Sequence, residues 1–425
     1  MAKFIINGGK PIGGTFHPRG NKNAVLPMLA SCLLTDQPII LHNVPLINDV
    51  KVMLQLLESI GVEVALEDHT LTLCAKGLRT TELDAELCAK VRTSILLAGP
   101  LTARHGGATI YPPGGDVIGR RRLDTHFYGL RSLGADISTD HAFRFKAGPL
   151  TAWKMVFDEA SVTATENVMM AATLAEGTST IYNAACEPHV QDLANLLNQM
   201  GADISGIGTN NLTIRGVGKL HGAEYTVQPD FMEVGSFIVA SAVTGGTLTI
   251  PDAGEPLVQQ VMQRTFSKLG VEWTRTGRTL VVPRQTERCI RPDEGNATPK
   301  IEDGIWPAFP SDLMSVSIVL ATQTQGTALF FEKMFESRMY FVDHLMGMGA
   351  NIIQCDPHRV VVIGPTRLRG SKLTSPDIRA GMALLIAACC ADGESVIHNA
   401  QVIDRGYEAI EDRLAALGAD IVREH

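Results

Sequence analysis

Large aromatic side chains are scarce in this chain of 425 residues. Phe, Tyr and Trp together make up 5% of the sequence, whereas glycine occurs 40 times. A core with few large rings has to be closed by aliphatic residues and alanine, which requires backbones that approach one another closely. The composition therefore predicts closely packed elements joined by many glycine-marked turns.

Other absences exclude whole classes of protein. The net charge is -8 and no long basic block interrupts the chain, which argues against a nucleic-acid surface. The longest apolar run, Met382 to Ala391, is much shorter than the roughly 20 residues that cross a bilayer, so we expect no membrane span. The apolar stretch near the amino terminus stops at Asn7, sooner than in a signal peptide, which favours a cytoplasmic protein.

Motifs that bind metals and cofactors are also missing. The eight cysteines contain no Cys-x-x-Cys pair and lie mostly in apolar segments, so we expect reduced, buried side chains with neither a zinc site nor a disulfide. A P-loop, a Gly-x-Gly-x-x-Gly turn after a strand and a Gly-x-Ser-x-Gly elbow are absent. ATP, dinucleotide and serine-hydrolase chemistry therefore lose support, and no metal or cofactor is predicted.

The sequence does contain a short motif that recurs six times. In each copy an apolar helical stretch ends in glycine, usually followed by Ala or Val and then by an acidic or amide residue. The glycines are Gly61, Gly134, Gly201, Gly270, Gly349 and Gly418. One or two such motifs could be ordinary helix ends, but six at intervals of about 70 residues indicate repeated units. We predict that each glycine closes a helix in the left-handed conformation and that a strand follows.

A second motif begins each unit. It consists of a helix of small residues, a turn and a strand in which apolar and polar residues alternate, as in SFIVASAVTGGTLTI. Helices that are small and apolar almost all round are typical of central, closely packed positions. At the length of the chain, three units make one domain. We therefore predict an α/β protein of two similar domains, with helices inside and sheets outside. Residues 22–229 would form the first domain, and residues 1–21 with 230–425 the second.

Two polar stretches in the first half stand where a helix should begin or a loop should run. Gly20-Asn21-Lys22-Asn23 opens a small-residue helix, and it would be either an anion site or an ordinary N-cap with an exposed lysine; the local sequence favours the second. Residues 112–124, PPGGDVIGRRRLD, combine glycines with three arginines suited to phosphate and carboxylate. The acid within this loop favours an active site over a solvated arginine run.

Two more polar stretches lie in the second half. Asp312, after Phe309-Pro310-Ser311, is either an N-cap or an acid open to solvent. Arg405, beside Gly406, is either an anion-binding side chain or a member of a surface ion pair. Cationic loops with two acids suit a highly anionic substrate and proton transfer.

Together, these four stretches resemble the UDP-N-acetylglucosamine 1-carboxyvinyltransferases, the enolpyruvyl transferases of peptidoglycan synthesis. The similarity runs from the first residues to the last turn. The resemblance implies two inside-out α/β barrels of three repeats each, with the active site in the cleft between them. It also implies transfer of enolpyruvate from phosphoenolpyruvate to the 3-hydroxyl of UDP-N-acetylglucosamine by addition and elimination, without a metal or cofactor. The partners would be these two small substrates, with no nucleic acid or membrane, in a monomer or weak homo-oligomer.

Residue roles follow from the same resemblance. Asp116 would be the general acid and Asp312 the base, while Lys22, Arg121 and Arg405 match the positions that hold phosphoenolpyruvate. The other matched positions are an active-site arginine (Arg92), a sugar contact (Asn23), the uridine stretch (Arg122, Leu123, Asp124, Thr125), the diphosphate segment (Ser161, Val162, Thr163) and further cleft residues (Glu187, Phe335, Asp377, Arg379).

Three departures from the family pattern stand out. Asp116 occupies the place of a cysteine that the antibiotic fosfomycin alkylates, and because a carboxylate is a poor trap for that epoxide, we predict insensitivity. Asn48 replaces a lysine and Leu96 a tryptophan. A sister transferase acting on another nucleotide or on shikimate 3-phosphate, and a non-catalytic binding paralogue, are the alternatives. The uridine match argues against shikimate 3-phosphate, and retention of Lys22 and Asp312 argues against the paralogue.

Overall fold

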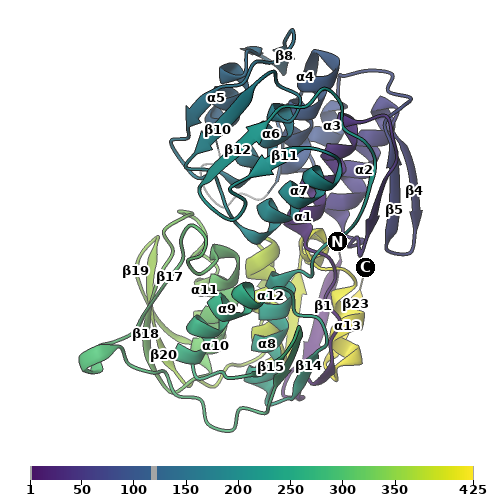
Figure 1. Cartoon of the computed structure of the whole chain (residues 1–425). Coiled ribbons are helices and arrows are strands. Elements are labelled where there is room, and N and C mark those ends of the chain that lie inside the picture. Colours follow the sequence, from purple (N-terminus) through teal and green to yellow (C-terminus); the bar gives the residue numbers. More distant parts are fainter. Residues whose placement is uncertain (1, 116–121, 425) are drawn as a thin grey trace. The chain divides into compact units, whose positions relative to one another are not determined.

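A computed structural model of the chain describes residues 2–115 and 122–424 (Figure 1). The chain divides into two compact units. We call residues 20–115 and 122–228 domain A, and residues 2–19 and 229–424 domain B. Among the described helices, none is both long enough and apolar enough to cross a membrane.

Domain A alternates helices with short strands. Its helices are α1 (Lys22–Ser31), α2 (Asn48–Ile60), α3 (Ala85–Cys88), α4 (Ala98–His105), α5 (Asp124–Ser132), α6 (Val162–Ala172) and α7 (Pro188–Gln199), with 3-10 turns η1 (Cys32–Leu34) and η2 (Arg92–Leu97). Its strands are β3 (Ile39–His42), β4 (Glu63–Glu67), β5 (Thr70–Cys74), β6 (Gly107–Ile110), β7 (Asp136–Thr139), β8 (Phe143–Lys146), β9 (Lys154–Val156), β10 (Thr178–Tyr182), β11 (Asp203–Ser205), β12 (Asn211–Arg215) and β13 (Ala223–Thr226).

Domain B repeats the same alternation. Its helices are α8 (Phe231–Thr244), α9 (Pro256–Lys268), α10 (Met314–Thr322), α11 (Val342–Gly347), α12 (Ile378–Cys390) and α13 (Ile410–Ala416), with 3-10 turns η3 (Glu294–Asn296), η4 (Ser311–Leu313) and η5 (Ala400–Arg405). Its strands are β1 (Lys3–Asn7), β2 (Gly14–Thr15), β14 (Leu248–Ile250), β15 (Thr274–Thr276), β16 (Thr279–Val282), β17 (Lys300–Glu302), β18 (Gly326–Phe331), β19 (Asn351–Asp356), β20 (Arg359–Gly364), β21 (Lys372–Thr374), β22 (Glu394–His398) and β23 (Asp420–Glu424).

The strands form six small sheets that share one plan. Five sheets have a parallel edge strand followed by three antiparallel strands, in the orders β13-β3-β5-β4, β9-β10-β12-β11, β2-β14-β16-β15, β17-β18-β20-β19 and β21-β22-β1-β23. The sixth, β6-β8-β7, has a single parallel bridge between Glu82 and Thr109 in place of the edge strand. Each unit of the predicted repeat therefore builds one sheet.

Each parallel edge strand is formed by the segment that follows another unit of the same domain in the sequence. In domain A the chain leaves β8 and adds β9 to the next sheet, and after β12 it adds β13 to the first sheet. In domain B the amino-terminal β1 pairs antiparallel with both β22 and β23, so it completes the last sheet of the chain, and β2 then joins the sheet of β14. These exchanges close the three units of each domain into a ring.

The six glycines of the repeat have the predicted backbone. Their φ angles lie between 75° and 106°, the left-handed region that favours glycine. In five units a strand begins two residues after the glycine. After Gly270 the strand β15 starts only at Thr274, because the backbone N–H and carbonyl of Glu272 bond to the side chain of Gln285 instead of to a strand.

The small-residue helices form the core of each domain, as predicted. Within domain A, α4 and α1 both contact α6, and within domain B, α8, α10 and α12 contact one another. Every residue of α10 is buried, as are the first 13 residues of α8. Close packing of helices with few large rings accounts for the low aromatic content, since a ring holds the backbones apart.

The expectation that the cysteines are buried was wrong for two of them. All eight are free, but Cys289 and Cys355 are exposed. Cys355 lies in β19, a strand whose side chains alternate between core and surface, so its neighbours in sequence do not report its burial. Within the described residues, no group of three or more His, Cys, Asp or Glu side chains is placed to hold a metal ion.

Candidate active site

The start of α1 in domain A carries a buried cation. The side-chain oxygen of Asn21 caps the helix by accepting hydrogen bonds from the N–H groups of Asn23 and Ala24, at 2.8 and 3.2 Å. Lys22 Nζ lies 2.8 Å from Asp49 Oδ2, with only 10% and 6% of these side chains exposed. The predicted N-cap is thus present, but the expectation of an exposed lysine was wrong. A helix amino terminus with a lysine provides positive potential suited to an anion.

The predicted uridine stretch lies at the start of α5. Arg92 Nη2 donates to the carbonyl of Arg122 at 3.2 Å, and the guanidinium of Arg122 pairs with Asp124. Arg122 and Asp124 are both more than half exposed, so their ion pair contributes little stability. Leu123 and Thr125 are buried, and Thr125 donates to the carboxylate of Glu159 at 3.3 Å. The structure therefore brings Arg92 next to the uridine stretch.

A buried histidine and asparagine connect these segments. His126 is 1% exposed, and burial together with the charge of Arg92 lowers its pKa to about 3, so the ring is neutral. Asn167 Nδ2 donates to His126 Nδ1 at 3.0 Å, which leaves Nε2–H to donate to Thr163 Oγ1 at 3.0 Å. Asn167 also bonds the carbonyl of Ile95 and the N–H of Gly99, at 3.0 and 2.7 Å.

This pair, which we call the His126–Asn167 hub, joins η2, α4, α5 and α6. Those elements carry Arg92, the uridine stretch and the predicted diphosphate segment. Sequence reasoning missed both residues. The histidine directly follows the uridine stretch, which is a signal that could have been used, whereas nothing local marks Asn167.

The remaining predicted residues of domain A lie at helix starts. Ser161 occupies the N-cap position of α6, followed by Val162 and Thr163 in its first turn, and Glu187 occupies the N-cap position of α7. Burial, reinforced by the charge of Glu187, raises the pKa of Glu166 well above its usual range. Both effects favour the protonated form of Glu166.

In domain B, Asp312 is held between two buried arginines. Its Oδ1 lies 2.8 Å from Arg338 Nη2, and its Oδ2 lies 3.0 Å from Arg379 Nε. The arginine side chains are 5% and 7% exposed, whereas that of Asp312 is 22% exposed. Burial alone would lower the pKa of each arginine, but Asp312 and other acids raise it above its usual value, so both remain cations. The carboxylate is thus fixed in orientation and still reachable.

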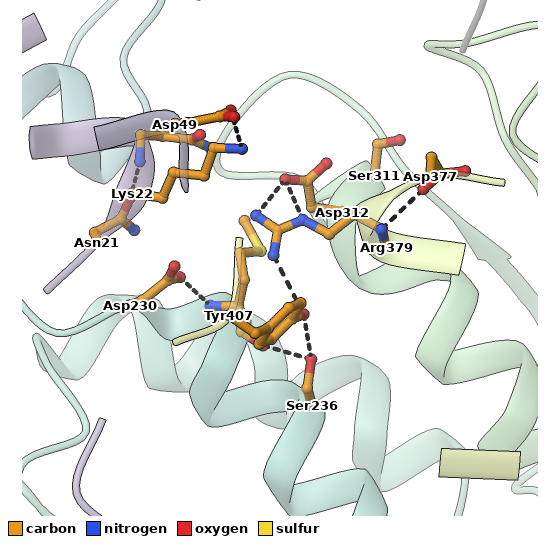
Figure 2. A network of polar contacts seen from close by, with 12 residues as sticks. Asn21, Lys22, Asp49, Asp230, Ser236, Ser311, Asp312, Asp377, Arg379 and Tyr407 are labelled. Carbon is orange, nitrogen blue, oxygen red and sulfur yellow. Dashed lines mark hydrogen bonds and ion pairs between the residues drawn. The ribbon is translucent and has the colours of Figure 1, made fainter. Parts of the chain in front are cut away.

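The interactions of Arg379 extend beyond Asp312 (Figure 2). Its Nη1 donates to the hydroxyl of Tyr407 at 3.2 Å, and that hydroxyl lies 3.0 Å from Ser236 Oγ. The side chain of Asp377 caps α12 by accepting from the N–H groups of Arg379 and Ala380, at 2.8 and 2.9 Å. The structure therefore gathers Asp312, Asp377 and Arg379, and it adds Arg338 and Tyr407, which sequence reasoning left out of the site.

Phe335 and Arg405 complete the predicted residues of domain B. The guanidinium of Arg338 lies over the ring of Phe335, 4.9 Å from its centre. Arg405 ends η5, beside Asp404, which binds Arg423 at 2.6 Å. Asp116 and Arg121 lie outside the described residues.

The two other departures from the family pattern lie in domain A. Asn48 opens α2 and is half-buried, whereas Leu96 is fully buried in the core.

Comparison with known proteins defines the family. The sequence profile of the EPSP synthase (3-phosphoshikimate 1-carboxyvinyltransferase) family matches residues 6–414. The chain is 54% identical over 422 residues, 99% of each chain, to the UDP-N-acetylglucosamine 1-carboxyvinyltransferase of Treponema denticola. It is 48% identical to that of Bacteroides thetaiotaomicron, with both chains covered completely. The chain therefore belongs to the EPSP synthase family and, within it, to the UDP-N-acetylglucosamine 1-carboxyvinyltransferases.

Solved structures agree on the fold. The enolpyruvyl transferase NikO of Streptomyces tendae has a TM-score of 0.87 and 22% identity, covering 99% of this chain and 98% of its own. EPSP synthase of Acinetobacter baumannii has a TM-score of 0.75 and 18% identity over both whole chains. The predicted α/β enolpyruvyl transferase fold is confirmed.

Proposed function

We propose that this protein transfers the enolpyruvyl group of phosphoenolpyruvate to the 3-hydroxyl of UDP-N-acetylglucosamine, releasing phosphate. The proposal rests on relatives named UDP-N-acetylglucosamine 1-carboxyvinyltransferase, to which the chain is about 50% identical in sequence over its full length. The retained polar stretches in both domains support an active enzyme over a binding paralogue.

The cations are proposed to hold phosphoenolpyruvate. Lys22 at the start of α1 supports this assignment, because the helix amino terminus favours a bound anion and the lysine, which pairs with Asp49, places a positive charge beside it. Arg405 and Arg121 are assigned the same role from the family pattern. Asn23 is assigned to the sugar, residues 122–125 to the uridine and residues 161–163 to the diphosphate. Arg92 is assigned as a further active-site arginine.

Asp312 is proposed to be the base. Two guanidinium partners favour its ionised form, which a base needs before it can accept a proton. In the addition step Asp312 would take the proton of the 3-hydroxyl while the sugar oxygen bonds to C2 of phosphoenolpyruvate and C3 gains a proton from Asp116. In the elimination step Asp116, left as a carboxylate by the addition, would take a proton from C3 while the C2–O bond to phosphate breaks, which restores the double bond. The proton held by Asp312 would leave with the phosphate.

The proposal is tested by phosphate release. Purified protein with phosphoenolpyruvate should release phosphate with UDP-N-acetylglucosamine, and not with UMP or shikimate 3-phosphate. Release with shikimate 3-phosphate would favour the sister transferase, and no release with any acceptor would favour the paralogue.

The role of Asp116 has its own test. Because a thiol loses its proton at higher pH than a carboxyl group, Asp116→Cys should keep activity and move the alkaline limb of the pH–rate profile upward. An unchanged limb would argue against Asp116 as the acid. Fosfomycin should leave the wild type active, and a covalent adduct on Asp116 would contradict that expectation.

A further inference from the structure

A second acidic side chain, Glu332, lies behind Asp312 in domain B. It directly follows β18 and is fully buried. Its carboxyl oxygens accept from Ser311 Oγ at 2.8 and 2.9 Å, and one of them also accepts from the N–H groups of Met334 and Phe335 at 3.2 Å. One carboxyl group thus joins the residue before Asp312 to the turn that carries Phe335 and Arg338.

Another buried acid, Asp303, lies beside Glu332. Asp303 is also fully buried, and its Oδ1 accepts from the N–H of Lys333 at 2.5 Å. Within the described part of the chain no side-chain or backbone donor reaches Asp303 Oδ2. Asp303 lies beside Glu332, because its backbone N–H donates to the carbonyl of Phe331 at 3.4 Å while its carboxylate accepts from the N–H of Lys333. Since ionised carboxylates only accept, a hydrogen bond between these two side chains requires a proton on one of them.

The surroundings favour one shared proton. Two adjacent carboxyl groups removed from water cannot both ionise without a large cost. Burial and the bond to Asp303 together raise the pKa of Glu332 to about 9. Arg338 is the nearby cation, but it binds Asp312; Lys333 Nζ binds Glu302, and His358 donates to the backbone carbonyl of Glu332.

We propose that Glu332 and Asp303 form a proton-sharing pair that positions Asp312, Arg338 and Phe335 for the acceptor substrate. The inference rests on the proposed function for its kinetic consequences. The pair holds η4 against the turn after β18. Because the two carboxyl groups share one proton, they carry a single negative charge near Arg338 instead of two. Loss of that proton would add an anion that competes with Asp312 for Arg338, so the orientation of Asp312 depends on the protonated state.

The first test compares two substitutions at one position. Glu332→Gln keeps an acceptor for Ser311 and a donor for Asp303 but cannot ionise, whereas Glu332→Ala removes all these bonds. We expect Glu332→Ala to raise KM for UDP-N-acetylglucosamine by at least about 10-fold, with KM for phosphoenolpyruvate within about 2-fold. Glu332→Gln should restore most of the acceptor KM and extend activity to higher pH than the wild type. Glu302→Gln, at a half-buried neighbour that pairs with Lys300 and Lys333, is the matched control and should resemble the wild type.

Three outcomes would overturn the proposal: equal damage from the Gln and Ala variants, wild-type kinetics in both, or an unchanged alkaline limb in Glu332→Gln. A stability measurement tests the proton pair without any activity. Because the folded protein holds a proton that unfolded Glu loses near pH 4.5, the wild type should lose stability relative to Glu332→Gln as pH rises toward about 9. Parallel stability curves would refute the pair even if the wild type proved inactive as a transferase.

Discussion

Domains A and B share one ring of three units but hold their polar residues in different ways. In domain A the neutral His126–Asn167 hub ties together the segments proposed to bind the nucleotide, and the central helix α1 is capped by the uncharged Asn21. In domain B the anion Asp312 is held by two arginines, and the central helices α8 and α12 are capped by the carboxylates of Asp230 and Asp377. Because Asn21 is neutral, it does not cancel the positive potential at the amino terminus of α1. The carboxylate caps in domain B, in contrast, neutralise the positive amino termini of α8 and α12. The difference teaches that one architecture can keep an uncharged helix cap in one domain and hold an oriented carboxylate between two arginines in the other.

The largest effect should come from Asp312, the proposed base in domain B. Asp312→Asn removes the proton acceptor and leaves both arginines buried opposite a neutral amide. We expect kcat for phosphate release to fall by about 10²–10⁴-fold, the usual contribution of a general base. Asp252→Asn, which changes an exposed acid paired with Arg278, is the control and should not alter kcat. A fall of less than about 5-fold in Asp312→Asn would remove Asp312 from the mechanism.

Breaking the neutral hub in domain A should have the next largest effect. Asn167→Ala leaves the N–H of Gly99, the carbonyl of Ile95 and the ring of His126 without their partner. Each unmade buried bond costs about 1–3 kcal/mol, so we expect a loss of about 3 kcal/mol in the free energy of unfolding. KM for UDP-N-acetylglucosamine should rise as well.

Asn198→Ala is the matched control for this experiment. Asn198 also bonds a backbone N–H and a carbonyl in domain A, both of Ile204. Its removal should lower stability without changing that KM. Equal KM changes in the two variants would show that the hub has no special place in the site.

The neutral state of His126 makes a prediction about pH. An unfolded histidine takes up a proton near pH 6.5, whereas folded His126 resists protonation down to about pH 3. The unfolded state therefore binds more protons in this range, so stability falls as pH falls. Between pH 7 and pH 5 the wild type should lose about 2 kcal/mol relative to His126→Gln in urea unfolding. His141→Gln, at an exposed histidine, should show the wild-type slope, and a shared slope in all three proteins would contradict a neutral buried His126.

The smallest effect should come from exchanging the helix caps between domains. Asn21→Asp keeps the cap geometry but places an anion at the start of α1, so KM for phosphoenolpyruvate should rise by about 10-fold with little loss of stability. The reverse change in domain B, Asp230→Asn, also preserves a cap and should change this KM by less than about 2-fold. Equal responses to both changes would mean that the two helix ends do not differ in function.

Local patterns in the sequence were enough to predict the repeat. A left-handed glycine after a helix and a helix of small residues are short-range features, so the six units and the inner helices could be predicted from spacing. The polar stretches likewise identified Lys22 and Asp312. Their ion pairs were not predictable in this way, because Arg379 lies 67 positions from Asp312 and only the packing of two units brings them together.

The sequence by itself determined the repeat, the class of the fold and the residue types that are proposed to meet an anionic substrate. Only the tertiary structure decided which of those residues are paired, buried, neutral or charged. The physical reason is that charge state depends on solvent exposure and on neighbours within a few ångströms. Those neighbours, such as Asn167 for His126 and Asp303 for Glu332, come from distant segments that the ring of sheets brings into contact.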